Sequence, residues 1–91
     1  MRIERKLITR MINACKEIDR GKDRTYKLDV KSAICRALHE NNAHPKDIGD
    51  AVGLDRTTVL YHIRLHDKKM AWDGYEEKYN KCKQIIEDYD N

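Results

Sequence analysis

Apolar residues recur along the first twenty positions with the spacing of one face of a helix. Steps of three and four residues separate them, and such steps turn side chains toward one side of an α-helix. Gly21 offers a stop, since glycine is favoured just past a helix end. We therefore expect a helix over about residues 2–20. Its apolar stripe contains Ile3, Leu7, Ile8, Met11, Ile12, Cys15 and Ile18.

A second helix is expected over about residues 29–41. Asp29 belongs to the residue types that cap a helix N-terminus, and Asn41 and Asn42 end the segment. The apolar positions between them share one face, which predicts a helix with one side in the core. They are Val30, Ala33, Ile34, Ala37 and Leu38.

Two short helices joined by a turn are expected between residues 45 and 66. Pro45 suits the first turn of a helix that ends at Val52, because proline lacks only an N–H that has no partner there. Gly53 breaks this helix, and Asp55 caps the next one, which ends near His66.

The last helix is expected over about residues 75–89, after a connector that contains Trp72. Five residues recur there at alternating four- and three-residue steps, the spacing of a short coiled-coil seam. The seam would either pair with a second copy of the chain or fold over the other helices and complete their core. It contains Tyr75, Tyr79, Cys82, Ile86 and Tyr89.

Composition and charge agree with this pattern. With 38% charged residues and one proline, the 91 residues predict a single all-α domain over 1–91, a compact bundle of about five helices. Residues 1–31 hold ten Lys/Arg and five Asp/Glu (+5), residues 32–72 six and five (+1), and residues 73–91 three and six (−3). A basic beginning and an acidic end suit contact with a polyanion at one end, although an unevenly charged solvated surface fits equally well.

The segment 48–63 carries a set of linked steric demands. A helix-turn-helix needs two helices that cross closely, joined by a short turn. Gly49 permits the close approach, and Gly53 permits a positive φ in the turn. Apolar side chains are spaced to clamp the two helices together: Ile48, Val52, Leu54, Val59 and Ile63. The segment therefore predicts a helix-turn-helix over about residues 45–66; a compact hairpin without DNA binding is the alternative.

This stretch resembles the helix-turn-helix regulators of bacteria and phages across about twenty residues. It is also similar to the C-terminal DNA-binding domain of the DnaA replication initiators, which read Ile-Gly-x-x-Phe-Gly-x-Arg-Asp-His-Thr-Thr-Val. The matching residues are Ile48-Gly49, Val52-Gly53 and Asp55-Arg56-Thr57-Thr58-Val59. The chain departs from that pattern by one missing turn residue, by Leu54 before the aspartate and by Arg56 in place of the histidine. It has no Gly-x-x-x-x-Gly-Lys-Ser/Thr motif, so the resemblance implies DNA binding rather than origin recognition.

With the apolar residues of the second helix turned inward, helical geometry points a different set outward. We expect Arg56 to bind the edge of guanine, and Thr57 and Leu60 to contact thymine methyl groups. Tyr61 and Arg64 would reach a base or the phosphates. Asp55 is most simply a cap and Thr58 a packed or phosphate-binding hydroxyl, although the resemblance implies DNA contacts for both.

Phosphate contacts are expected from lysines and arginines outside this helix. Lys46, at the start of the first helix of the motif, would bind a phosphate, because helix N-termini attract anions. An ordinary surface lysine is the equally weighted alternative. Further phosphate contacts would come from Arg20, Lys22, Arg24 and Lys27.

Other chemistry is not expected. Cys35 with His39 and His62 with His66 are four residues apart, but this spacing is not that of a standard zinc site. We expect no metal, no cofactor and no catalytic residues, and therefore no enzyme. We expect His66 to interact with the end of its helix.

The location of the protein follows from its cysteines and its termini. Three widely spaced cysteines without a Cys-x-x-Cys pair favour reduced thiols in a cytoplasm, that of the host if a phage encodes the chain. No signal-peptide core or membrane span of ~20 apolar residues is evident.

The sequence thus predicts a sequence-specific binder of double-stranded DNA, a small regulator of transcription or replication. A homodimer through the last helix would let it read two half-sites. The alternative is a protein-interaction adaptor that uses the same motif without specific DNA binding.

Overall fold

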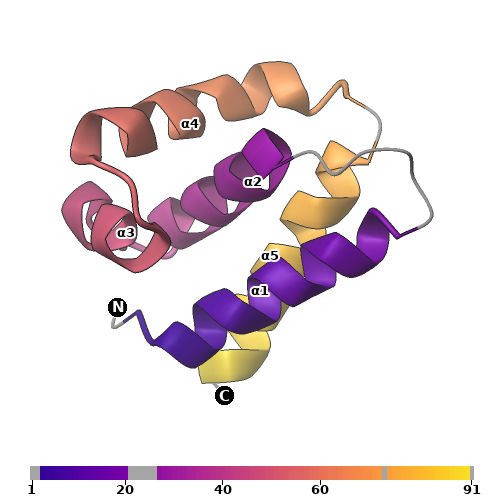
Figure 1. Ribbon diagram of the computed structural model, residues 1–91, viewed down its shortest axis with the longest axis horizontal. Coiled ribbons are helices and arrows are strands. Elements are labelled where there is room, and N and C mark those ends of the chain that lie inside the picture. The colour runs from indigo at the N-terminus through magenta and orange to yellow at the C-terminus, as the bar shows by residue number, and fades with distance from the viewer. Residues whose placement is uncertain (1–2, 21–26, 73, 91) are drawn as a thin grey trace.

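The computed structural model describes residues 3–20, 27–72 and 74–90 of the chain. They form five helices, as the apolar pattern predicts, and the all-α fold is confirmed (Figure 1). The helices are α1 (Arg5–Ile18), α2 (Lys27–Glu40), α3 (Pro45–Val52), α4 (Arg56–Lys69) and α5 (Tyr75–Asp90).

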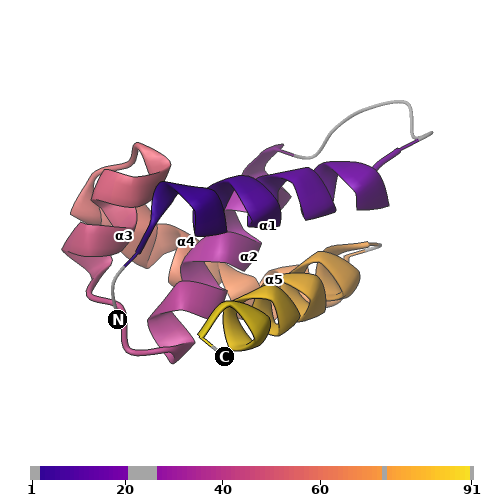
Figure 2. The same ribbon diagram turned by 90° about the horizontal axis from the view of Figure 1, so that it is seen from below.

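Helix α2 lies at the centre of the molecule and contacts each of the other four helices (Figures 1 and 2). The apolar face expected for it is buried, and so are residues outside that face. Ser32 is fully covered, with its hydroxyl against His62 of α4. Helix α2 is therefore a core helix with neighbours on several sides, rather than a surface helix with one buried stripe.

The seam of α5 packs inside the chain, against α1 and α2. Tyr75, Tyr79, Cys82 and Ile86 are buried, and Tyr89 is half-buried. The sulfur of Cys82 lies 3.8 Å from that of Cys15 in α1, and both thiols are free. The seam therefore completes the core, which is one of its two expected roles. A dimer through α5 would have to use the other side chains of this helix.

Three helix boundaries differ from the prediction. Helix α1 ends at Ile18, two residues before the expected end. The expected stop at Gly21 lies outside the described residues. Helix α2 begins at Lys27, so Asp29 lies in its first turn and does not precede it as a cap. Helix α4 continues past His66 to Lys69. Both Asp29 and Lys69 are buried, and their ion pair links the first turn of α2 to the last turn of α4.

Candidate nucleic-acid interface

Two glycines shape the turn between α3 and α4. A Cβ atom on Gly49 would lie 2.4 Å from the carbonyl oxygen of Leu54, so only glycine permits this approach of the two segments. The carbonyl of Gly49 accepts hydrogen bonds from the N–H groups of Gly53 (2.8 Å) and Leu54 (2.9 Å). Gly53 itself has a φ of 77°, in the left-handed region that favours glycine. The two steric demands expected from the sequence are therefore met.

The apolar clamp around this turn is also present. Ile48, Val59 and Ile63 are buried, while Val52 and Leu54 are half-buried against the core. The clamp fixes the crossing of α3 and α4, and it decides which side of α4 remains outside.

Asp55 caps α4, as expected. Its Oδ1 accepts a hydrogen bond from the backbone N–H of Thr58 at 2.7 Å. That bond lowers the pKa of the exposed Asp55 carboxyl, because it stabilises the charged form. The carboxylate is thus held at the helix end, next to the outward side chains of Arg56 and Thr57.

The outer face of α4 carries the side chains predicted to contact DNA. Thr57, Tyr61 and Arg64 follow one another at steps of four and three residues, and all three are exposed, Tyr61 by 54%. Arg56 and Leu60 lie beside this row; Arg56 is exposed and Leu60 is half-buried. Thr58, on the other flank, is half-buried. Helix α4 runs along one edge of the molecule (Figure 1).

Lys68 belongs to the same row, and the sequence analysis missed it. It is exposed, four residues after Arg64 in the helix. The pattern placed residue 68 in a connector, because the apolar periodicity fades after Ile63. The other exposed charge near the end of α4 is Asp67, on the flank of Arg56 and Leu60. The signal that could have revealed Lys68 is its spacing of seven residues from Tyr61.

Helix α3 presents its own N-terminus beside the motif. The Nδ1 atom of His44 accepts a hydrogen bond from the backbone N–H of Lys46 at 3.2 Å, so His44 is the cap of this helix. Lys46 is exposed, as a phosphate contact requires, but so are Asp47 and Asp50. This cap is not evident from the sequence, since histidine is not among the preferred capping residues.

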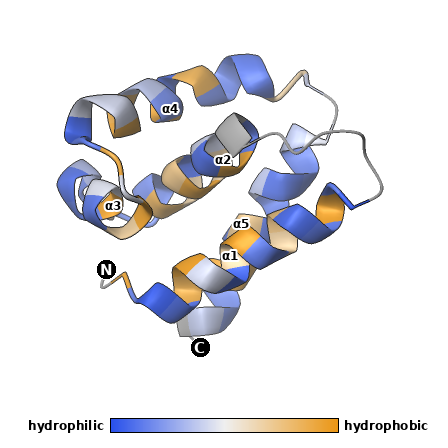
Figure 3. Cartoon of the chain, viewed as in Figure 1, coloured by the Kyte–Doolittle hydropathy of each residue, from blue (hydrophilic) through white to orange (hydrophobic). Residues whose placement is uncertain are grey.

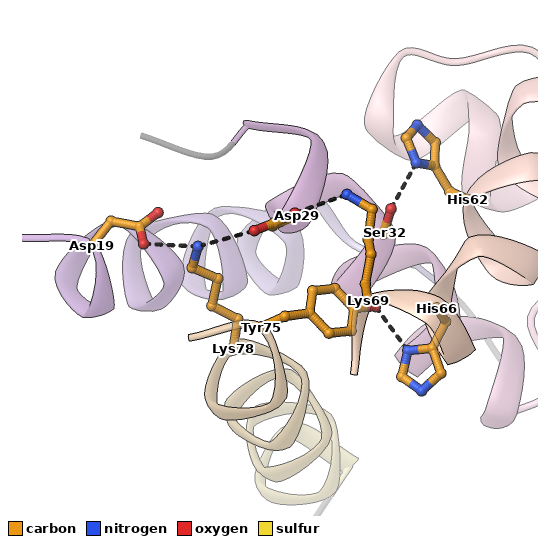
Figure 4. Close-up of polar contacts among 8 residues, drawn as sticks. All are labelled: Asp19, Asp29, Ser32, His62, His66, Lys69, Tyr75 and Lys78. Atoms are coloured by element: carbon orange, nitrogen blue, oxygen red, sulfur yellow. Dashed lines mark hydrogen bonds and ion pairs between the residues drawn. The ribbon is translucent and has the colours of Figure 1, made fainter. Parts of the chain in front are cut away.

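The inner face of α4 is held largely by polar groups. Figure 3 shows this helix mostly in the colours of hydrophilic residues. The Nδ1 atom of His62 lies 2.8 Å from the hydroxyl of Ser32, and that of His66 lies 2.7 Å from the hydroxyl of Tyr75 (Figure 4). His66 therefore contacts α5, which corrects the expectation that it interacts with the end of its own helix.

The surroundings of both histidines favour the neutral ring. Burial lowers the pKa of His62, and the nearby ammonium groups of Lys69 and Lys31 lower it further. Burial also lowers the pKa of His66, with a contribution from Arg36 that Asp67 and Glu40 oppose. Neutral rings can accept or donate hydrogen bonds in the core without the cost of a buried charge.

A buried ionic cluster lies behind the last turn of α4. The Nζ atom of Lys69 is 2.8 Å from Oδ1 of Asp29, and the Nζ atom of Lys78 is 2.7 Å from Oδ1 of Asp19. Lys78 also lies 3.9 Å from the second oxygen of Asp29, so it connects the two carboxylates (Figure 4). The cluster joins α4 and α5 to the start of α2 and the end of α1.

Of the basic residues expected to add phosphate contacts, Arg20 is the one whose side chain the structure describes, and it is not part of this face. Arg20 is exposed just after the end of α1, where it pairs with Glu17. In Figures 1 and 2 this end of α1 and the beginning of α4 lie on opposite sides of the molecule. Lys22, Arg24 and the side chain of Lys27 lie outside the described residues. Among the basic residues that the structure describes, Arg56, Arg64 and Lys68 give the outer face of α4 its positive charge.

Within residues 3–20, 27–72 and 74–90, no group of three metal-ligating side chains is placed to hold an ion. None of the described helices combines the length and the apolar character needed to cross a bilayer.

No protein-family model, curated protein or solved structure matches this chain. The geometry of the helix pair and the chemistry of its exposed face therefore carry the functional argument.

Proposed function

We propose that the protein binds double-stranded DNA in a sequence-specific manner, with the first half of α4 in the major groove. The proposal rests chiefly on one observation: α4 exposes Arg56, Thr57, Tyr61 and Arg64 on one side while its other side is locked into the core. The major groove admits one α-helix, and the N-terminal residues of such a helix meet the base edges.

The roles of the side chains follow from their places on the helix. Arg56, in the first turn, donates to the O6 and N7 atoms of a guanine, a contact worth about 1–3 kcal/mol of discrimination. Thr57 and Leu60 meet thymine methyl groups, and Tyr61 and Arg64 reach a base or the backbone. Lys68, at the far end, and Lys46, at the start of α3, contact phosphates. Asp55 and Thr58 keep the first turn of α4 in place.

The decisive experiment selects preferred duplexes from a random pool and measures three variants on the selected site. Arg56→Ala should relax the preference at one base pair, with a loss of about 1–3 kcal/mol on the selected site. Lys68→Ala should weaken binding to all sequences alike and lower the slope of log K against log salt by about 1. Lys81→Ala, which removes an exposed lysine of α5, is the matched control and should change neither quantity.

A single helix reads only a few base pairs, and we propose that two copies bind two half-sites about one turn of DNA apart. Sedimentation of the protein with and without the selected duplex tests this point. A palindromic selected site with two copies bound is the expected result, and a monomer on a single short site would exclude the dimer.

The second candidate function is a protein-interaction adaptor. Asp47 and Asp50 lie exposed on α3, and such carboxylates oppose a phosphate backbone. An exposed tyrosine such as Tyr61 is also a frequent anchor of protein interfaces. An adaptor would bind selected and random duplexes equally, whereas a regulator favours its site by about 10³ or more.

A further inference from the structure

A groove lies between α1, α2 and α3, and none of its lining residues comes from α4. Its volume is about 270 Å³. Apolar side chains from all three helices form its floor and walls, and two lysines complete the lining. The residues are Ile8, Ile12, Lys16, Val30, Lys31, Ile34, Ala51 and Val52.

The two lysines lie toward the same end of the groove, where α1 ends and α2 begins. These two helix ends are close together, because Lys78 contacts both Asp19 and Asp29. Ile8, Ile12 and Lys16 are spaced by four residues, so they follow one another along one side of α1 over roughly 12 Å at ~1.5 Å per residue. Lys16 is exposed and Lys31 is half-buried on α2. Their stems line the apolar wall, and this arrangement leaves the ammonium groups in contact with water.

The positive charge at this end is not neutralised within the described part of the chain. Neither Lys16 nor Lys31 forms an ion pair with a described residue. The neighbouring carboxylate, Glu17, pairs instead with Arg20 at 3.2 Å. The other end differs, because the hollow next to Ile8 and Ala51 is lined by one cation and one anion, Arg5 and Asp50. The groove is thus apolar along its length and cationic at one end only.

The size of the groove favours a small molecule over a macromolecule. Pockets for drug-sized ligands span roughly 300–1,000 Å³ and are mostly apolar with a few polar groups that fix orientation. At about 270 Å³ this groove is slightly smaller and suits a correspondingly small ligand. A stable protein interface uses about 20–30 residues on each side, and this groove has eight. A short amphiphile fits both the volume and the charge pattern.

We propose that the groove binds a small amphiphilic carboxylate of the medium-chain fatty acid class. The hydrocarbon chain lies along Ile8 and Ile12, and the carboxylate meets the ammonium groups of Lys16 and Lys31. Ala51 and Val52 of α3 form the opposite wall. This site is separate from the outer face of α4 and does not depend on DNA binding.

Calorimetric titration of the full chain without DNA tests the assignment, with three ligands of equal chain length below their micellar concentrations. Decanoate should bind more tightly than decanol, and decylamine should bind most weakly, because only the carboxylate complements the lysines. Lys16→Gln and Lys31→Gln should each weaken decanoate binding by about two- to fivefold, as expected for exposed ion pairs, and leave decanol unchanged. Lys81→Gln, an exposed lysine remote from the groove lining, is the control.

A second variant separates occupation of the groove from binding elsewhere. Ala51→Phe fills the space between α1 and α3 and should abolish binding of both decanoate and decanol, provided circular dichroism shows a folded chain. Equal affinity for the three ligands, absence of binding, or unchanged binding by Ala51→Phe would overturn the assignment. So would sedimentation without DNA that shows a dimer of the unaltered chain and a monomer of Ala51→Phe, because a second copy would then cover the groove. Loss of DNA binding would affect none of these measurements.

Discussion

The first turn of α4 and its last turns are held in place by different means. At the beginning, backbone groups hold the helix: the carbonyl of Gly49 accepts two N–H groups of the turn, and Asp55 accepts the N–H of Thr58. At the end, side chains from other helices hold it, through Ser32, Tyr75 and Asp29. The outer face between these ends is exposed and can meet a ligand.

The position of α4 thus depends on neighbouring residues in the sequence at its beginning and on contacts with other helices at its end. The turn and cap involve residues 49–58, so a change there alters how α4 starts and crosses α3. Two of the three polar contacts at the other end join residues 30 and 40 positions apart, and the third joins His66 to Tyr75, nine positions away. A change there loosens the packing of α2, α4 and α5 together. The proposed DNA-binding face needs both, because a recognition helix must be positioned as well as formed.

The largest effect is expected from Asp29→Asn, because Asp29 of α2 pairs with Lys69 at the far end of α4. The change leaves the ammonium group of Lys69 buried without its charged partner, and such losses cost about 3–5 kcal/mol. Urea denaturation would measure the fall in unfolding free energy. Glu76→Gln, on the exposed face of α5, is the control and should change it little.

A double variant shows what the ion pair itself contributes. Asp29→Leu with Lys69→Met removes both charges and should recover most of the stability lost in Asp29→Asn, because apolar residues of similar size often replace buried pairs without loss. If the double variant were less stable than Asp29→Asn, the desolvated pair would be stabilising in its own right.

The next effect concerns the beginning of α4. Gly49→Ala brings a methyl group within 2.4 Å of a backbone oxygen, and the overpacking should cost about 1–3 kcal/mol. Gly53→Ala meets no atom within 4 Å but places a side chain at a φ of 77°, a cost of roughly 1–2 kcal/mol. Urea denaturation of both variants compares their unfolding free energies. Gly53→Asn should lose less stability than Gly53→Ala, since asparagine tolerates a positive φ. Equal stability of Gly49→Ala and the unaltered chain would show that α3 and α4 can separate without cost.

The same contrast explains what could be predicted from sequence. Gly49, Gly53 and Asp55 act within ten residues of one another, and each has few steric or capping alternatives. Their spacing therefore predicts the turn, the cap and the direction of the outward side chains. The five helices follow for the same reason, because apolar periodicity is a local signal.

The remaining features depend on distant partners that leave no local pattern. Nothing near Lys69 indicates that this lysine is buried, and nothing near Asp29 indicates a partner forty residues away. The local pattern therefore predicts a helix cap at Asp29 and an end of α4 at His66, and both predictions are wrong. The same error placed Lys68 in a connector and removed it from the expected DNA-binding face. Apolar spacing does not reveal the last turns of α4, because the buried residues there, His66 and Lys69, are polar.

A smaller effect is expected from pH, again at the end of α4. Burial lowers the pKa of His62 and His66, so the unfolded chain takes up protons at a higher pH than the folded chain. The free energy of unfolding should therefore fall as the pH is lowered from about 7 through the ordinary histidine range near 6.5. Denaturation at a series of pH values down to about 5 measures the slope. The dependence of the unfolding free energy on pH should be weaker in His62→Gln and His66→Gln. The control is His39→Gln, which changes an exposed side chain and should leave this dependence as it is.

The smallest effect is expected at the cap. Asp55→Ala leaves the N–H of Thr58 to water, and the melting temperature should fall by less than in Gly49→Ala, because water can satisfy an exposed group. Asp55→Asn keeps an oxygen for that N–H and should retain most of the stability at neutral pH.

The hydrogen bond lowers the pKa of Asp55, so its contribution to stability is present above the ordinary pKa range of an aspartate. That contribution is lost as the pH falls through the lower pKa of the folded state. The difference in stability between the unaltered chain and the Asp55→Asn variant should therefore narrow in acid. If Asp55→Ala also relaxed the base preference on the selected duplex, the carboxylate would contact DNA, as the resemblance to the DnaA domain implies, rather than act only as a cap.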